Sequence, residues 1–162
     1  MGNKVISGEY PPGSTFKIIT GTAALELGKV TPEELIFDSG QHWLIPMGNA
    51  GGEALGWINF QQALSMSDNV YFYEMGNRLG INNLVDFARK FGMGRKTGIE
   101  LEGEASGLLP TPENKRKIFT GEDWTLGDTF NASIGQGIDL ATPLQMAVMM
   151  SCIAGGGIYH QP

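Results

Sequence analysis

The sequence is poor in the residues that build disulfides and metal sites. Its 162 residues include a single cysteine, Cys152, so no internal disulfide can form. The histidines, His42 and His160, stand alone in the sequence, and neither has the neighbouring Cys or His ligand of a metal motif. We therefore expect no metal site and no cofactor. Cys152 lies in an apolar stretch, which predicts a buried structural thiol rather than a nucleophile.

Long hydrophobic runs and positive charge are also scarce. The longest apolar run, residues 146–154, is too short to span a bilayer, and we find no signal peptide. Lysine and arginine number 11 against 17 acidic residues, a formal net charge of −6, which argues against a nucleic-acid partner. Glycine is abundant, at 24 residues, and indicates many turns and loops.

The stretch GEYPPGSTFKIITGTAALELG, residues 8–28, contains the first candidate site. Two prolines hold the approach to Ser14 extended, and a helical pattern of apolar residues begins immediately after it. Ser14 is thus predicted in the first turn of a helix, where backbone N–H groups are unpaired and the dipole is positive. Lys17 lies one turn along on the same face, so its amine can reach the Ser14 hydroxyl. Taken alone, an N-cap serine and a surface lysine explain the pattern equally well.

Apolar periodicity predicts a mainly α fold. Further helices are expected at residues 58–66, 70–79, 82–91 and 143–153, the last apolar on nearly every side and therefore buried. Thr31-Pro32-Glu33-Glu34 has the composition of a helix start. Residues 37–56 are expected to be irregular, with a short hairpin around residues 43–45, and residues 92–137 to be loop-like, with only short strands or helices. We expect the Ser14 helix to pack against the helices in residues 58–79 and against the helix at residues 143–153.

A second motif completes a chemically coherent set. Ser67-Asp68-Asn69 interrupts the helical pattern, and together with Ser14-x-x-Lys17 it matches the serine acyltransferases that bind penicillin. A serine hydroxyl is a weak nucleophile that needs a base, and a lysine can serve if its pKa is lowered. Ser67 can pass the proton to a leaving amine, and Asn69 can hold Lys17 and a substrate amide. The Ser14 N–H can supply half of an oxyanion hole.

Several independent segments resemble the class B penicillin-binding proteins, most of all penicillin-binding protein 2 of the elongation type. These segments are GEYPPGSTFK, SDNVYFYEMGNRLGI, FGMGRKTGIELEGEASGLLP, GDTFNASIGQG and ATPLQMA, which together cover nearly the whole chain. By this resemblance Ser14 matches the acylated serine, Lys17 the general base, and Ser67 and Asn69 the second motif. Asp68 occupies the variable middle position of that motif and is assigned no catalytic role.

Lys96-Thr97-Gly98 looks like the third motif of this family, a Lys-Thr-Gly on a β-strand. Its surroundings are wrong, since the triplet lies in a glycine-rich loop between FGMGR and IELEGE. The family has a TGI-x-L-x-GE segment at this point, so we interpret Lys96 as an exposed loop residue. The chain then ends at Pro162 before the third motif and most of the central sheet. We expect residues 1–162 to be the helical lobe of a transpeptidase-like α/β fold, inactive alone.

The resemblance implies a peptidoglycan D,D-transpeptidase that cross-links stem peptides ending in D-Ala-D-Ala through a serine acyl-enzyme. It also implies acylation by β-lactam antibiotics, a membrane glycan polymerase as partner, and a place on the outer face of the bacterial cytoplasmic membrane. Alternatives are a serine β-lactamase and a β-lactam sensor domain. The E-x-x-L-N segment of class A β-lactamases is absent, and class D enzymes usually carry Ser-x-Val where this chain has Ser67-Asp68-Asn69. A helical domain with coincidental motifs would not show five matching segments in order.

Overall fold

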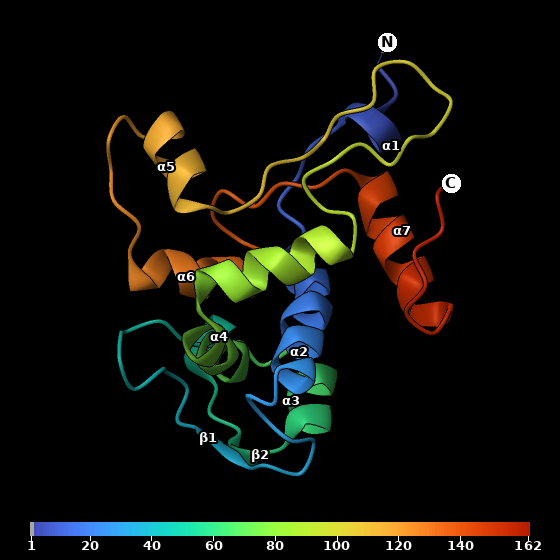
Figure 1. Cartoon of the computed structure of the whole chain (residues 1–162). Coiled ribbons are helices and arrows are strands. Elements are labelled where there is room, and N and C mark those ends of the chain that lie inside the picture. The colour runs from blue at the N-terminus through green and yellow to red at the C-terminus, as the bar shows by residue number, and fades with distance from the viewer. Residues whose placement is uncertain (1) are drawn as a thin grey trace.

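A computed structural model describes residues 2–162, and within them the chain is mainly α-helical (Figure 1). The helices are α1 (Lys4–Ser7), α2 (Lys17–Glu26), α3 (Phe60–Met66), α4 (Asn69–Lys90), α5 (Pro112–Ile118), α6 (Leu126–Ser133) and α7 (Pro143–Ala154), with 3-10 turns η1 (Gly13–Phe16) and η2 (Ala50–Gly52). Strands β1 (Ile36–Asp38) and β2 (Gly56–Ile58) form a two-stranded antiparallel sheet in which Phe37 lies opposite Trp57. The predicted mainly α class is confirmed. In the described part of the chain, no helix combines the length and apolar character needed to cross a membrane.

The core forms where α4 packs against α2 on one side and α6 on the other (Figure 1). Phe16, Ile19 and Ala23, spaced three and four residues apart, are fully buried, as the helical pattern predicts. Leu27 departs from that prediction and is 42% exposed, because α2 ends at Glu26 and the chain turns away through Gly28 at φ 64°.

Helix α4 is broken at Gly80, which has φ 73° and ψ 159° and so cannot continue an α-helix. Two helical segments therefore meet there at an angle, as the view of α4 shows (Figure 1). The sequence prediction of two helices separated by Gly80 is confirmed. The first segment begins at Asn69, directly after Ser67 and Asp68, and so carries the second motif at its N-terminus.

Two local predictions are wrong. Thr31-Pro32-Glu33-Glu34 forms one turn rather than a helix, with the Glu34 N–H donating to the Thr31 carbonyl, because the chain immediately extends into β1. No strands flank residues 43–45. A single antiparallel bridge joins Gln41 and Gly48, and the ladder of this region lies further out, between β1 and β2.

Helix α7 is also less buried than its composition predicts. Met149 and Cys152 join the core, which confirms the buried thiol, but Met150 and Ile153 are 44% and 42% exposed. The helix packs mainly along α1 rather than along α2. A pocket of about 280 Å³ lies between it and the other helices, lined by Thr22, Phe87 and Cys152 among others. Apolar residues on all sides of a helix therefore do not mean burial on all sides here.

Asp139 provides a first test of the fold. It is 1% exposed, neither carboxylate oxygen has a hydrogen-bond partner within residues 2–162, and burial raises the pKa of this carboxyl well above its ordinary value. Because the unfolded chain releases the proton at lower pH, folding stability should fall as pH rises above about 4. We expect Asp139→Asn to raise the free energy of unfolding at pH 7 by about 1–3 kcal/mol. Thermal melts between pH 4 and 8 measure the effect.

The exposed Asp86 offers a matched control, since Asp86→Asn should leave the melting curves almost unchanged. Equal pH dependence of stability in wild type and Asp139→Asn would show that the Asp139 carboxyl does not cause the loss of folding stability at higher pH.

Candidate active site

Ser14 lies in a tight turn that leads directly into α2. Gly13 takes φ 59°, η1 covers Gly13–Phe16, and α2 begins at Lys17, so Ser14 and Lys17 are one turn apart as predicted. The Gly13 N–H donates to the Gly135 carbonyl at 2.9 Å, and the Thr20 hydroxyl donates to the Ser133 carbonyl at 2.7 Å. The C-terminal end of α6 therefore fixes the position of the Ser14 turn. Ser14 itself is exposed.

Gly135 tolerates no side chain at this contact. A Cβ there would lie 2.2 Å from the Gly13 carbonyl oxygen and 2.7 Å from the Phe16 Cβ, and its φ is +71°. In the intact protein that contains this chain, we expect Gly135→Ala to displace the Ser14 turn and to reduce labelling by a fluorescent penicillin, a reaction that the resemblance assigns to Ser14, by about tenfold or more. The fluorescence of the protein band on a gel, followed over time, measures the rate of labelling.

Gly103 has a similar positive φ and nothing near its Cβ position, so Gly103→Ala is the matched control. Equal labelling of both variants would mean that the Gly13–Gly135 contact does not position Ser14.

Ser67 lies between α3 and α4 in a left-handed conformation, with φ 55° and ψ 43°. A non-glycine residue in this region carries a conformational cost, and such residues concentrate at functional sites. Asp68 follows as the N-cap of α4, its carboxylate accepting from the Tyr71 N–H at 2.6 Å. This tight reversal directs both the carbonyl and the hydroxyl of Ser67 toward Lys17.

The residues of the two motifs form one continuous hydrogen-bonded chain. The buried Lys17 amine donates to the Ser67 carbonyl at 2.7 Å, to the Ser67 hydroxyl at 3.1 Å and to Asn69 Oδ1 at 2.7 Å. The Ser67 and Ser14 hydroxyls are hydrogen-bonded at 3.0 Å. The structure thus brings Ser14, Lys17, Ser67 and Asn69 together. Within the described residues Lys17 reaches Ser14 through the Ser67 hydroxyl rather than by a direct hydrogen bond.

The environment of the site favours the neutral, deprotonated form of the Lys17 amine more than water does. Burial lowers the pKa of Lys17 to about 8, an effect partly opposed by the negative charge of Asp68. Asp68 is itself buried, and desolvation together with the neighbouring Asp38 raises the pKa of its carboxyl to about 6. A pKa of about 8 leaves a minority of the Lys17 amine deprotonated near neutral pH, and this is the form that a general base requires.

Lys96 lies apart from these residues. It is exposed and in a segment without regular structure, as predicted, and it lines none of the wall of the Ser14 pocket. The adjacent Thr97 is buried, its backbone N–H donating to the Glu104 carboxylate at 2.6 Å. The Gly98 carbonyl accepts from the Gln161 side chain. The Lys-Thr-Gly triplet here serves the loop structure.

A pocket of about 320 Å³ opens over the motifs. Its wall includes Ser14, Ser67 and Asn69, and it also includes Asn49 and Glu53, which the sequence did not single out. These two residues belong to the glycine-rich segment between β1 and β2, where no periodic pattern marks a functional position.

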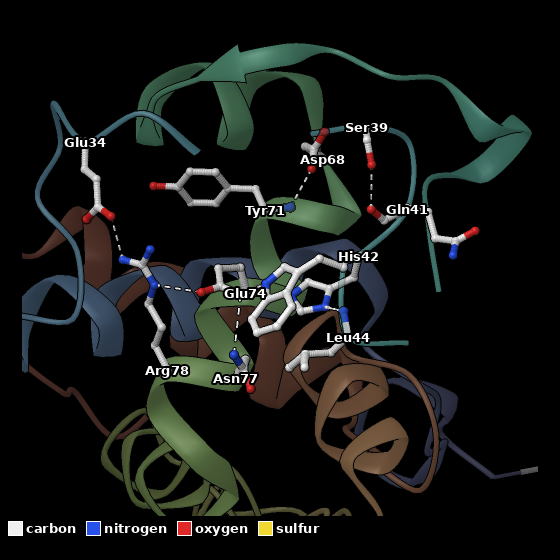
Figure 2. Close-up of polar contacts among 11 residues, drawn as sticks. Glu34, Ser39, Gln41, His42, Leu44, Asp68, Tyr71, Glu74, Asn77 and Arg78 are labelled. Carbon is white, nitrogen blue, oxygen red and sulfur yellow. Dashed lines mark hydrogen bonds and ion pairs between the residues drawn. The ribbon is translucent and has the colours of Figure 1, made fainter. Parts of the chain in front are cut away.

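A second pocket, of about 360 Å³, lies beside α4. Figure 2 shows the network of polar and charged side chains to which several of its lining residues belong. His42 Nε2 contacts a Glu74 carboxylate oxygen at 2.8 Å, and the other oxygen accepts from Arg78 Nε at 3.0 Å. Arg78 also pairs with Glu34 at 2.8 Å. The buried His42 is thus paired with a carboxylate. Within residues 2–162 there is no cluster of three or more His, Cys, Asp or Glu side chains that could hold a metal ion.

Comparisons with known proteins agree with this geometry. A family model described as the penicillin binding protein transpeptidase domain matches residues 1–162. The chain belongs to the penicillin-binding protein transpeptidase family. Peptidoglycan D,D-transpeptidase MrdA of Acinetobacter baumannii is 36% identical over 99% of this chain, and MrdA of Escherichia coli K12 is 36% identical over the same share. The chain spans only 24% and 26% of those two relatives, about a quarter of their length.

Solved structures place the fold in the same family. Penicillin-binding protein 2 of Pseudomonas aeruginosa matches with a TM-score of 0.93 and 38% identity, covering 99% of this chain and 37% of that one. Penicillin-binding protein 2 of Helicobacter pylori matches with a TM-score of 0.87 and 34% identity, covering 96% and 30%. These matches confirm the predicted resemblance to the penicillin-binding protein 2 type. With a sheet of two strands among the described residues, the chain is a mainly helical part of that α/β fold.

Proposed function

We propose that residues 1–162 are the helical part of the catalytic domain of a peptidoglycan D,D-transpeptidase. The observation that carries the proposal is the hydrogen-bonded chain from the Lys17 amine through the Ser67 hydroxyl to the Ser14 hydroxyl. A base, a proton carrier and an exposed nucleophile in this order suit acyl transfer. The names of the MrdA relatives support the same activity.

The proposed first half-reaction forms an acyl-enzyme. The Ser14 oxygen attacks the carbonyl carbon of the D-Ala-D-Ala peptide bond while its proton passes through Ser67 to neutral Lys17. The Ser14 N–H stabilises the oxyanion of the tetrahedral intermediate. When that intermediate collapses, the C–N bond breaks, and the proton returns through Ser67 to the departing D-alanine amine.

The second half-reaction releases the enzyme. An amine of a neighbouring stem peptide attacks the ester carbonyl at Ser14, and Lys17 receives the proton of that amine through Ser67. When the tetrahedral intermediate collapses, the bond between the carbonyl carbon and the Ser14 oxygen breaks, and Lys17 returns the same proton through Ser67 to the Ser14 oxygen. Asn69, which holds the Lys17 amine at 2.7 Å, keeps the base in place and is available to the substrate amide. A β-lactam enters the same first step, but its amine stays tethered after ring opening, so the acyl-enzyme persists.

The solved relatives suggest partners. The Helicobacter pylori protein is described in a complex with MreC, and another match describes a peptidoglycan synthase complex that coordinates polymerization and crosslinking. A Mycobacterium tuberculosis penicillin-binding protein 3 is described in complex with ampicillin. For this chain we infer peptidoglycan stem peptides as substrates, β-lactams as inhibitors and a membrane glycan polymerase as partner. That partnership implies a site of action on the outer face of the cytoplasmic membrane.

The test uses the intact protein that contains this chain, supplied with polymerised peptidoglycan bearing pentapeptide stems. We expect cross-linked dimeric stems and released D-alanine by mass spectrometry, both blocked by prior benzylpenicillin. Fast turnover of nitrocefin would support a β-lactamase instead. Stable labelling by penicillin without any cross-linked product would support a β-lactam sensor.

A further inference from the structure

Asn49 contacts the second motif from outside. Its Oδ1 atom accepts from the backbone N–H of Asn69 at 2.9 Å and from that of Val70 at 3.3 Å. These N–H groups belong to the first turn of α4, where a helix has no acceptors of its own. Asp68 caps the next N–H, that of Tyr71. The start of α4 is therefore held by a side chain that lies 20 residues earlier in the sequence.

The other side of the Asn49 amide faces carboxylates. Its Nδ2 atom donates to Asp38 Oδ2 at 2.8 Å and to the Glu53 carbonyl at 2.9 Å, and lies 3.3 Å from Asp68 Oδ2. The orientation of the amide is fixed by these partners, since the backbone donors of Asn69 and Val70 require an oxygen and the carboxylates require N–H groups. Among uncharged side chains, only asparagine and glutamine carry both an amide oxygen and two N–H donors, and glutamine is longer by one methylene.

Asp38 ties the same amide to the sheet. It is 1% exposed, its Oδ1 accepts from the Gly40 N–H at 2.7 Å, and its Oδ2 accepts from the Leu55 N–H at 2.8 Å. Both ends of the segment between β1 and β2 are thus joined to one carboxylate, and Asn49 links that carboxylate to α4. The buried carboxyls of Asp38 and Asp68 both lie on the Nδ2 side of the Asn49 amide, opposite the backbone of α4, and form one cluster with it.

We propose that Asn49 is a positioning residue for acyl transfer, which holds the Ser67–Asn69 turn in the geometry that presents Ser67 and Asn69 to Lys17. The inference rests on the proposed function. Among the described residues no hydrogen bond joins Asn49 to the Ser14 or Lys17 side chains, so it acts through Asn69 and the strained Ser67. Without its acceptor, the first N–H groups of α4 lose their partner and the left-handed Ser67 is free to relax.

Replacing Asn49 by aspartate tests the contribution of the Nδ2 donor separately from that of the Oδ1 acceptor. Asn49→Asp keeps an oxygen toward Asn69 and Val70 but places a third carboxyl against Asp38 and Asp68. The other charged groups near this cluster are Lys17 on α2 and Glu53 in the same loop. At low pH a shared proton can replace the lost N–H donor, whereas at higher pH the carboxylates repel one another. The defect of Asn49→Asp should therefore grow with pH.

The experiment measures acylation of the intact transpeptidase by a fluorescent penicillin under stopped flow, at a temperature where circular dichroism shows every variant folded. For Asn49→Ala we expect the acylation rate constant to fall 10- to 100-fold with little change in the initial binding constant. For Asn49→Asp we expect a ratio of wild-type to variant rates that increases at least threefold from pH 6 to pH 8. Asn83→Ala is the matched control, because Asn83 donates to the Leu79 carbonyl away from the site.

The outcomes separate this inference from the proposed function. A wild-type protein that takes no label would overturn the proposed function itself. A labelled wild type with Asn49→Ala no slower than Asn83→Ala would overturn the positioning role alone. If Asn49→Ala does not fold, Asn49→Asp decides the matter, since a constant rate ratio across pH would contradict the arrangement of Asn49 between two carboxylates.

Discussion

Benzylpenicillin is expected to add the mass of one antibiotic molecule to the intact transpeptidase, and Ser14→Ala is expected to remove that addition entirely. Ser14 is the exposed hydroxyl at the end of the hydrogen-bonded chain, whereas Ser67, which is also exposed, lies between Ser14 and Lys17 and is placed to carry the proton. Removal of a serine nucleophile lowers acyl transfer by a factor on the order of 10⁶. Intact-mass spectrometry after a short incubation reads the result directly.

Thr15 supplies the matched control for this prediction. It is the next residue in the same turn, it is exposed, and its hydroxyl donates to the Pro12 carbonyl at 2.6 Å, so Thr15→Ala should keep the adduct. Persistence of the adduct in Ser14→Ala, with peptide mapping to Ser67, would reverse the roles assigned to the two serines.

The sequence predicted those features of the site that depend on local spacing. Ser14 and Lys17 are one helical turn apart, and Ser67 and Asn69 flank a single helix start, so short motifs fix their local geometry. The break at Gly80 was predictable for the same reason, because one glycine at positive φ ends the helical segment. That the two motifs meet follows from the packing of α2 on α4, which the apolar periodicity of both helices favours.

Contacts made by irregular segments were not predictable. Asn49 lies between Gly48 and Ala50 in a segment with no apolar period, and its partners Asp38 and Asn69 are 11 and 20 residues away. Nothing in the residue type distinguishes it from a turn asparagine. The exposed side of α7 was missed for a related reason, since composition tells how apolar a helix is but not which neighbours cover it.

Asp68 illustrates how burial changes an interpretation. The motif alone assigns it no chemistry, and its hydrogen bond to the Tyr71 N–H is that of an ordinary N-cap. Yet it is 2% exposed, and its negative charge raises the pKa of Lys17 against the effect of burial. Its place in the cluster with Asp38 and Asn49 also connects the protonation of that cluster to the base. A residue outside the hydrogen-bonded chain from Lys17 to Ser14 thus shifts the pKa of the proposed base.

Replacement of Lys17 by methionine is expected to slow acylation of Ser14 by a factor of 10² to 10⁴, the usual contribution of a general base. Methionine resembles the apolar stem of the buried Lys17 side chain but accepts no proton. The pH dependence of the wild type should identify the same group. Burial lowers the pKa of Lys17 to about 8, so the neutral amine, and with it the acylation rate, should increase as pH rises from 6, reach half of its plateau near pH 8 and level off about one pH unit higher.

The sign of this dependence is decisive, because acylation requires the deprotonated amine. In Lys17→Met the residual rate should lack the inflection near pH 8, whereas Lys29→Met, at an exposed lysine beyond the other end of α2, should retain both the rate and the inflection. An inflection that persists in Lys17→Met would assign the titration to another group. A wild-type rate that falls as pH rises toward 8 would mean that Lys17 acts as a charged group, orienting Ser67 and Asn69 rather than accepting the Ser14 proton.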